Sequence, residues 1–235
     1  MKIQIYPDVF EIAPDFHRGV VIADGLNNGG DSEALQESLT EAQKEVKAFE
    51  EIASIPSIAA WDEAHRRFAS NPNKFPPAHK NLLKRVHRPD VTLPFISKVV
   101  AVMNTASLRL RTPVGGDDID RVLSFGEALD LRLADGSESF LPLGKDAKEE
   151  SPEVGEIVYV VARTVMCRRW NGRNSCHTLI GNDTKRIVMN IDCLGPDAED
   201  LAKKGTALVG ELLLRHCGAT VTEHVLGPAN PELAL

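Results

Sequence analysis

The segment RIVMNIDC (186–193) carries the polar residues whose placement most suggests a binding site. It has the apolar, β-branched character of a buried strand, and successive strand side chains point to opposite faces. The four apolar side chains at the odd positions therefore share a core face, whereas Asn190 and Asp192 share the other face. Amides and carboxylates that point inward from a buried strand are suited to a polar ligand. We predict that Asn190 and Asp192 line a ligand cavity.

The Gly-Gly pair of TPVGGDD supplies a second set of candidate site residues. Glycines do not sustain a helix, so we predict a turn at Gly115 and Gly116. Asn104 lies in the helix predicted just before this turn, and we expect Asn104 and the turn to line the same cavity. Asp118 is a candidate ligand contact, whereas Asp117 is expected to serve the turn or to cap the next helix.

Six basic residues near these segments are candidates for contacting RNA. Lys and Arg side chains neutralise phosphates, and that neutralisation supplies most non-specific affinity for nucleic acids. The alternative is that these charges are solvated side chains flanking strands. The six candidates are Arg163, Arg168, Arg169, Arg173, Lys185 and Arg186.

The elements that position these residues follow from the hydrophobic pattern. Runs that are β-branched or alternate in polarity predict strands, and apolar steps of three and four predict helices. The apolar, β-branched segment 156–170 is expected to be one long central strand. We predict a single α+β domain over 1–235, with a mixed sheet, surrounding helices and a pocket core at about 95–217. Strands are predicted at 1–6, 19–26, 125–136, 156–170, 186–193 and 219–227, and helices at 32–53, 81–86, 95–108 and 197–217.

Composition limits the class of protein. The 235 residues, 43% hydrophobic and 26% charged, suffice for one sizeable core. The formal net charge of −7 disfavours a protein that coats nucleic acid, so only a local basic patch is expected to contact RNA. There is no cationic leader and no apolar run of the roughly 20 residues that span a bilayer. We therefore expect a cytoplasmic protein without a membrane or DNA partner.

The cysteines are spaced irregularly. In an intracellular chain of this size we expect reduced thiols rather than a disulfide framework. A zinc site formed with His177 is an alternative, but no close Cys-x-x-Cys pair supports it. We predict no metal and no cofactor. The cysteines are Cys167, Cys176, Cys193 and Cys217.

The two polar segments resemble the pocket-forming segments of the editing domain, the B3/B4 domain, in the beta subunit of phenylalanyl-tRNA synthetase. There, an Asn near a helix end precedes by nine positions the Pro of a Pro-x-His-Ala-Phe-Asp turn, as Asn104 precedes Pro113 here. A family Thr six residues before the end of an apolar run corresponds to Thr184, which stands six before Asn190. The segment FHRGVVIADGL also resembles the strand that opens the family's domain. The resemblance covers almost the whole chain and implies the family's fold.

This resemblance implies an aminoacyl-tRNA deacylase, which hydrolyses the ester between a wrong amino acid and the terminal adenosine of a tRNA. A free-standing copy would act in trans on the acceptor end of a mischarged tRNA, as a monomer or weak homo-oligomer. The family's chemistry relies on substrate hydroxyls and a held water. No Gly-x-Ser-x-Gly elbow is present, so we nominate no nucleophile. The candidates for positioning the water are Asn104, Thr184 and His177.

Two departures from the family bear on the substrate. The family's His in the turn is Gly115 here, and its Glu at the end of the apolar strand is Asn190. In the synthetase those side chains hold a misacylated tyrosine, so their loss disfavours a tyrosyl ester. Inward carboxylates and amides would suit a guanidino group. Some free-standing members of the group are associated with removing the arginine analogue canavanine from tRNA(Arg), so we expect canavanyl-tRNA(Arg) as the substrate.

A non-catalytic module of the same fold is the alternative function, because a fold does not determine an activity. Such a module would bind an amino acid or the tRNA end without turnover. A metal-dependent hydrolase is a third class, which metal analysis of the purified protein would decide.

Overall fold

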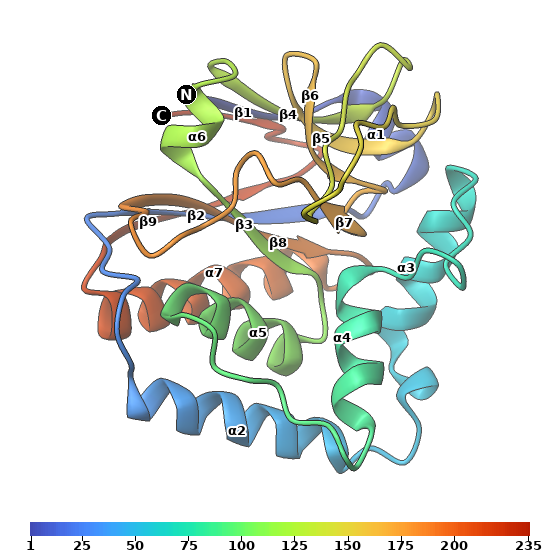
Figure 1. Ribbon diagram of the computed structural model, residues 1–235. Helices are drawn as coiled ribbons and strands as arrows, with labels where there is room; N and C mark the ends of the chain where they lie inside the picture. Colours follow the sequence, from blue (N-terminus) through green and yellow to red (C-terminus); the bar gives the residue numbers. More distant parts are fainter.

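Two β-sheets lie one on the other in the computed structural model, which describes residues 1–235 (Figure 1). The four-stranded sheet is antiparallel, with the order β3-β8-β2-β9. The six-stranded sheet has the order β10-β1-β4-β5-β6-β7 and is mixed, because β1 and β4 run parallel. The strands are β1 (Lys2–Ile5), β2 (His17–Asp24), β3 (Val114–Asp118), β4 (Ala128–Leu133), β5 (Ile157–Val161), β6 (Thr164–Arg168), β7 (Arg173–Asn174), β8 (Arg186–Cys193), β9 (Thr220–Leu226) and β10 (Glu232–Ala234).

Helices cover the outer face of the four-stranded sheet. The long helix α7 and helix α5 lie directly against it, and α2 packs on the far side of α5 (Figure 1). No helix combines the length and the apolar character that a membrane crossing requires. The helices are α1 (Pro7–Ile12), α2 (Glu33–Lys47), η1 (a 3-10 turn, Ile52–Ser54), α3 (Pro56–Arg67), α4 (Ala78–His87), α5 (Lys98–Leu110), α6 (Ile119–Leu123) and α7 (Ala198–Cys217).

Strand β8 separates two hydrophobic cores. Its side chains Ile187, Met189 and Ile191 enter a core of 29 buried residues shared with α2, α5 and α7. Val188 points the other way, into a core of 22 buried residues between the two sheets. Asn190 and Asp192 have the same parity as Val188, so their buried side chains also lie between the sheets. The predicted division of this strand into an apolar and a polar face is confirmed.

The predicted α+β class, with a mixed sheet and surrounding helices, is also confirmed, although the strands form two sheets. Helix α7 ends where the sequence predicts it, because Gly218 takes the left-handed conformation (φ 65°) that ends a helix. The helix predicted at 32–53 is shorter. It ends at Lys47, and the apolar pattern continues through the separate 3-10 turn η1.

The prediction of one long strand at 156–170 is wrong. The segment is a hairpin of β5 and β6, joined by Ala162 and Arg163. Ala162 takes a positive φ of 52°, which a two-residue hairpin turn requires. The sequence has no Gly, Asn or Asp at this turn to signal it.

The prediction of a turn at the Gly-Gly pair is also wrong, because these residues lie within β3, paired with β8. Gly116 is needed for close packing rather than for a turn. A Cβ there would lie 2.7 Å from Met189 Sδ and 2.9 Å from the Val188 carbonyl oxygen. Gly115 is different, since a Cβ there would meet no atom within 4 Å. Strand β3 therefore presents an open wall at Gly115.

Candidate functional site

A cavity of about 70 Å³, here called the inner cavity, lies between the two sheets in front of Gly115. Strands β3 and β8 form one wall, and residues of β5, β6 and the segment after β6 form the other. Asp117 and Asp192 are the charged residues in its lining. The lining residues are Ala78, Pro113, Val114, Gly115, Gly116, Asp117, Tyr159, Cys167, Trp170, Asn171, Asn174, Asn190 and Asp192.

The polar wall predicted on β8 is engaged by an arginine of the protein itself. Arg18 in β2 is fully buried, and its Nε donates to Asn190 Oδ1 at 3.0 Å. Its Nη2 donates to the same oxygen. The guanidinium also lies over the Tyr159 ring, 4.6 Å from the centroid. The carbonyl oxygen of Asn190 is therefore not free to accept from a ligand.

Asp192 is likewise held by the protein. The Tyr159 hydroxyl donates to Asp192 Oδ1 at 2.6 Å. Burial raises the pKa of Asp192 to about 6, and the charge of Arg18 together with the Tyr159 bond opposes that rise. The buried positive charge of Arg18 thus has Asp192 as a nearby counter-charge. Both predicted β8 residues lie at the cavity, and both already have partners.

The positions of Asp117 and Asp118 differ from those expected. Asp118 is the N-cap of α6, accepting from the Arg121 amide at 3.1 Å, and its other oxygen accepts from Thr184 Oγ1 at 2.6 Å. Asp117 has the opposite strand parity and lines the inner cavity. Burial raises the pKa of Asp117 to about 6, against the effects of the Thr178 hydrogen bond and Arg18. Because the segment is a strand and not a turn, alternation exchanges the two aspartates.

The three candidates for positioning a water lie elsewhere. Asn104 is half-buried on α5 and lies outside the inner cavity's lining. His177 is also outside the lining, and its ring packs 5.0 Å from that of Phe125. Thr184 accepts from the Gly181 amide at 2.9 Å and donates to Asp118, so it fixes its own loop. This placement revises the prediction for all three residues.

Gly116 lines the inner cavity, and its backbone N–H does not bond to β8. The Asp192 amide donates to the Pro113 carbonyl oxygen, so Pro113 and Asp192 form a hydrogen-bonded pair of the antiparallel ladder. Every second residue after Pro113, namely Gly115 and Asp117, therefore bonds to β8, and Gly116 lies between them. The Gly116 N–H therefore points away from β8, on the edge of β3 where the Asp118 N–H donates to the Thr178 carbonyl oxygen at 3.0 Å. Cys167 also lines the cavity, but burial raises the pKa of its thiol far above the usual range. It is consequently a poor nucleophile.

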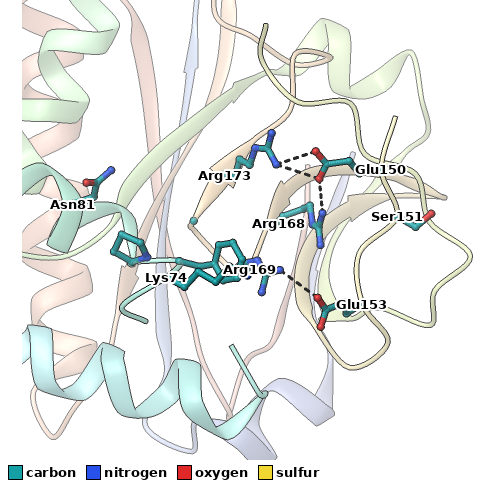
Figure 2. A pocket seen from close by; sticks show the side chains of 11 residues that line it. Lys74, Asn81, Glu150, Ser151, Glu153, Arg168, Arg169 and Arg173 are labelled. Atoms are coloured by element: carbon teal, nitrogen blue, oxygen red, sulfur yellow. Dashed lines mark hydrogen bonds and ion pairs between the residues drawn. The ribbon is translucent and has the colours of Figure 1, made fainter. Parts of the chain in front are cut away.

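A larger, charged cavity of about 540 Å³, here called the outer cavity, is drawn in Figure 2, and its lining shares the segment 168–174 with that of the inner cavity. Trp170, Asn171 and Asn174 of this segment line the inner one, and Arg168, Arg169, Gly172 and Arg173 line the outer one. Residues 75–78 also contribute to both cavities, with Phe75 and Pro76 in the outer one and Ala78 in the inner one. The outer cavity is lined by Lys74, Phe75, Pro76, Asn81, Glu150, Ser151, Glu153, Arg168, Arg169, Gly172 and Arg173.

The three arginines of the outer cavity differ in their freedom. Arg168 is buried and bound to Glu156 (2.8 Å) and Glu150 (2.7 Å), so it holds the fold together. Arg169 lies over the Phe75 ring, with its guanidinium carbon 3.6 Å from the centroid and Glu153 at 3.6 Å. Arg173 is half-exposed and pairs with Glu150 at 3.0 Å (Figure 2). Arg173 is therefore the arginine that an anionic ligand reaches directly, whereas Arg169, with a side chain only 12% exposed, must first leave the Phe75 ring.

The other three basic candidates do not line the outer cavity. Arg163 is exposed at the β5–β6 turn, and Lys185 is exposed before β8. Arg186 pairs with Asp120 of α6, with Nη2 and Oδ1 2.5 Å apart. Only half of the predicted basic set is thus brought together.

Arg18 and Tyr159 are not among the site residues predicted from the sequence pattern, which assigns Asp117 to the turn or to helix capping. Arg18 in β2 and Tyr159 in β5 each place one polar group among apolar side chains that point between the two sheets. That isolated polar group is the signal that could have found them. No three His, Cys, Asp or Glu side chains are grouped so that they could hold a metal ion.

Comparisons with known proteins relate the chain to one family. No curated protein matches it. Among solved structures, the N-terminal fragment of the phenylalanyl-tRNA synthetase beta-subunit from Pyrococcus horikoshii matches 95% of this chain, with 12% sequence identity and a TM-score of 0.45. The chain spans about half of that fragment, 54%. The B3/4 domain profile matches residues 60–208, which is more than half of the sequence. The chain therefore belongs to the B3/4 domain family.

Proposed function

We propose that this protein hydrolyses the ester of a mischarged tRNA in trans, with canavanyl-tRNA(Arg) as the leading substrate. The observation that carries the proposal is the inner cavity at Gly115 and Asn190, in a chain of the B3/4 domain family. The synthetase resemblance connects that family with the removal of wrong amino acids from tRNA. The cavity's charged residues are aspartates, which favour a basic amino acid over a tyrosyl group.

The neighbouring cavities suit the two parts of such a substrate. The outer cavity offers Lys74, Arg169 and Arg173 to the phosphates of the tRNA 3′ end. Phe75 under Arg169 offers a ring on which a base can stack once the arginine turns towards a phosphate. The inner cavity then receives the amino acid. The ester would lie between them, near the edge of β3.

An activated ester needs little beyond a positioned water and stabilisation of the oxyanion. The Gly116 N–H at the edge of β3 is the donor that we assign to the oxyanion. The Cys167 thiol is not suited to attack, since burial raises its pKa far above the usual range. A water held by the substrate's own hydroxyl groups is consistent with this arrangement.

A non-catalytic binding module is the second candidate, and one observation favours it. Asn104, His177 and Thr184, the side chains expected to position water, are absent from the inner cavity's lining. A module would hold the aminoacylated 3′ end and protect it. Stoichiometric binding of canavanyl-tRNA(Arg) with no release of amino acid would favour the module.

The purified protein is expected to release canavanine from tRNA(Arg) without ATP and after exhaustive chelation. Ester hydrolysis is downhill, and the sequence has no phosphate-cradling Gly-rich loop with a Lys. Release is measured with labelled amino acid on a panel that includes arginyl, tyrosyl and canavanyl tRNAs. Loss of activity with chelator, restored by zinc, would contradict the proposed metal-free mechanism.

Replacing both Arg169 and Arg173 with Ala is expected to weaken tRNA binding and flatten its salt dependence. For a single strand, each phosphate that the protein no longer neutralises lowers the slope of log K against log salt by about 0.7. Binding is measured from low to moderate salt. Arg163→Ala, which removes an exposed charge outside the cavity, is the matched control. Arg168 is left intact because it is buried in ion pairs. An unchanged slope in the double variant would return these arginines to a structural role.

A further inference from the structure

We propose that Asp117 is the carboxylate that binds a cationic group of the ligand, and thereby selects basic amino acids. This inference rests on the proposed function, because it assigns a specificity determinant within the same cavity. It replaces Asp118, Asn190 and Asp192, the residues that the sequence pattern favours for this role.

The alternatives to Asp117 are already engaged. Asn190 Oδ1 accepts two hydrogen bonds from Arg18. Asp192 accepts from Tyr159, and Arg18 offsets its charge. Asp118 caps α6 and accepts from Thr184. At Asn190 and Asp118 a ligand would have to displace protein donors, and at Asp192 it would compete with Arg18, Tyr159 and the Asn171 side chain.

Asp117 keeps a free oxygen. Its Oδ1 accepts from Thr178 Oγ1 at 2.5 Å, whereas its Oδ2 forms no hydrogen bond. The ion pairs of its neighbours, Arg121 with Asp118 and Arg186 with Asp120, do not involve Asp117, and Arg18 acts on it through its charge without an ion pair. Asp117 is thus a carboxylate of the cavity that lacks a bound cation.

The balance of charge around the inner cavity points the same way. Two carboxylates, Asp117 and Asp192, line it, and one buried guanidinium, Arg18, lies behind its wall. When both carboxylates are ionised, one negative charge has no counter-charge. Buried charges are stable when they are paired, so the cavity favours one cationic group from outside.

The position of Asp117 leaves room for that group. Besides the inner cavity, it lines a second cavity of about 180 Å³ between α5, β3 and the segment 174–180. Gly115, with the same strand parity, has no atom in front of it within 4 Å. Entry along Gly115 would bring the basic side chain of the ligand to Asp117, while the phosphates of the ligand would stay at the outer cavity. The inner cavity would therefore take the cationic side chain of the ligand, and the outer cavity its phosphates.

Asp117→Asn tests the inference, because it keeps the shape and the Thr178 contact but removes the charge. The probes are stable amide analogues, 3′-aminoacylamino-3′-deoxyadenosines carrying canavanine, lysine or the neutral norleucine. Wild type should bind the cationic probes more tightly than norleucine. In Asp117→Asn that preference should fall by about ten- to a hundredfold, the range for a charge-assisted hydrogen bond. Asp120→Asn, an exposed aspartate three residues away, is the matched control.

The outcomes separate this inference from the proposed function. Charge-selective binding that disappears in Asp117→Asn supports the inference even if no ester is hydrolysed. Absence of hydrolysis would contradict only the proposed deacylase activity. Ester hydrolysis with the same preference in wild type and Asp117→Asn overturns the inference and leaves the deacylase. Failure of every probe to bind wild type also overturns it. Asp117→Asn removes a carboxylate whose pKa burial raises, so it should melt no lower than wild type.

Discussion

Gly115→Leu is expected to lower deacylation and binding of the amide probes by about a hundredfold or more, without loss of stability. A displaced ligand loses its alignment with the attacking water, and misplacement by about 1 Å can cost that much in rate. A leucine side chain at position 115 would point into the inner cavity and occupy space that the ligand needs. Position 115 has no positive φ and open space in front of it, so the side chain enters without strain. Rates, probe affinity and melting temperature are measured together.

Two control variants separate blocking from disruption. Gly116→Ala should lower stability, because its Cβ would press against Met189 Sδ at 2.7 Å and the Val188 carbonyl oxygen at 2.9 Å. Gly29→Leu adds the same side chain in a loop where only Asn27 Oδ1, at 3.6 Å, is near. It should change neither activity nor melting temperature. A Gly115→Leu protein that is stable and fully active would show that ligands bind elsewhere.

The opposite behaviour of adjacent glycines shows where sequence reasoning stops. The sequence pattern assigns both residues to a turn, because Gly-Gly is a local signal for one. The packing of Met189 against Gly116 depends on strand pairing across more than 70 residues, and no local pattern encodes it. Assigning a turn instead of a strand then exchanges Asp117 and Asp118. One error in secondary structure thus becomes an error in the site.

Features with a local period are predicted well. The two faces of β8 follow from alternation alone, and the end of α7 follows from Gly218. The partner of Asn190 does not, because Arg18 lies 172 residues away in sequence. The β5–β6 turn escapes prediction since Ala162 adopts a positive φ that its residue type rarely takes. The local sequence pattern therefore predicts the polar wall of Asn190 and Asp192, whereas the tertiary fold determines which protein groups bind to it.

Acid is expected to destabilise the protein through two buried histidines. His65 of α3 and His79 of α4 are fully buried against Trp61, and none of their ring nitrogens forms a hydrogen bond. Burial, assisted by Arg169 and Lys80, lowers the pKa of His65 to about 3. Burial, assisted by His65 and Lys80, lowers the pKa of His79 to about 3 as well. Each ring is therefore held neutral in the folded state.

The direction in which stability changes with pH follows from proton uptake. Below the ordinary pKa of 6.5 the unfolded chain binds a proton at each histidine and the folded protein does not. Stability from these rings is complete above pH 6.5 and is lost as the pH falls towards 3. At pH 5 the loss is about 2 kcal/mol for each histidine. Asp117 and Asp192 act in the opposite sense, because their pKa values of about 6 let the folded state take up protons first. The wild-type pH profile therefore contains two opposing contributions.

Single replacements should separate the two contributions. His65→Phe and His79→Phe keep an aromatic ring against Trp61 but remove the titrating group. Between pH 7 and pH 5, the unfolding free energy of each variant should rise relative to wild type by about 2 kcal/mol. Denaturant unfolding at both pH values measures this difference, in which the aspartate contributions cancel. Phe68→Leu, in the same cluster and without a titrating group, should differ from wild type by the same amount at both pH values. If the His variants behave as Phe68→Leu does, the histidines are not held neutral by burial.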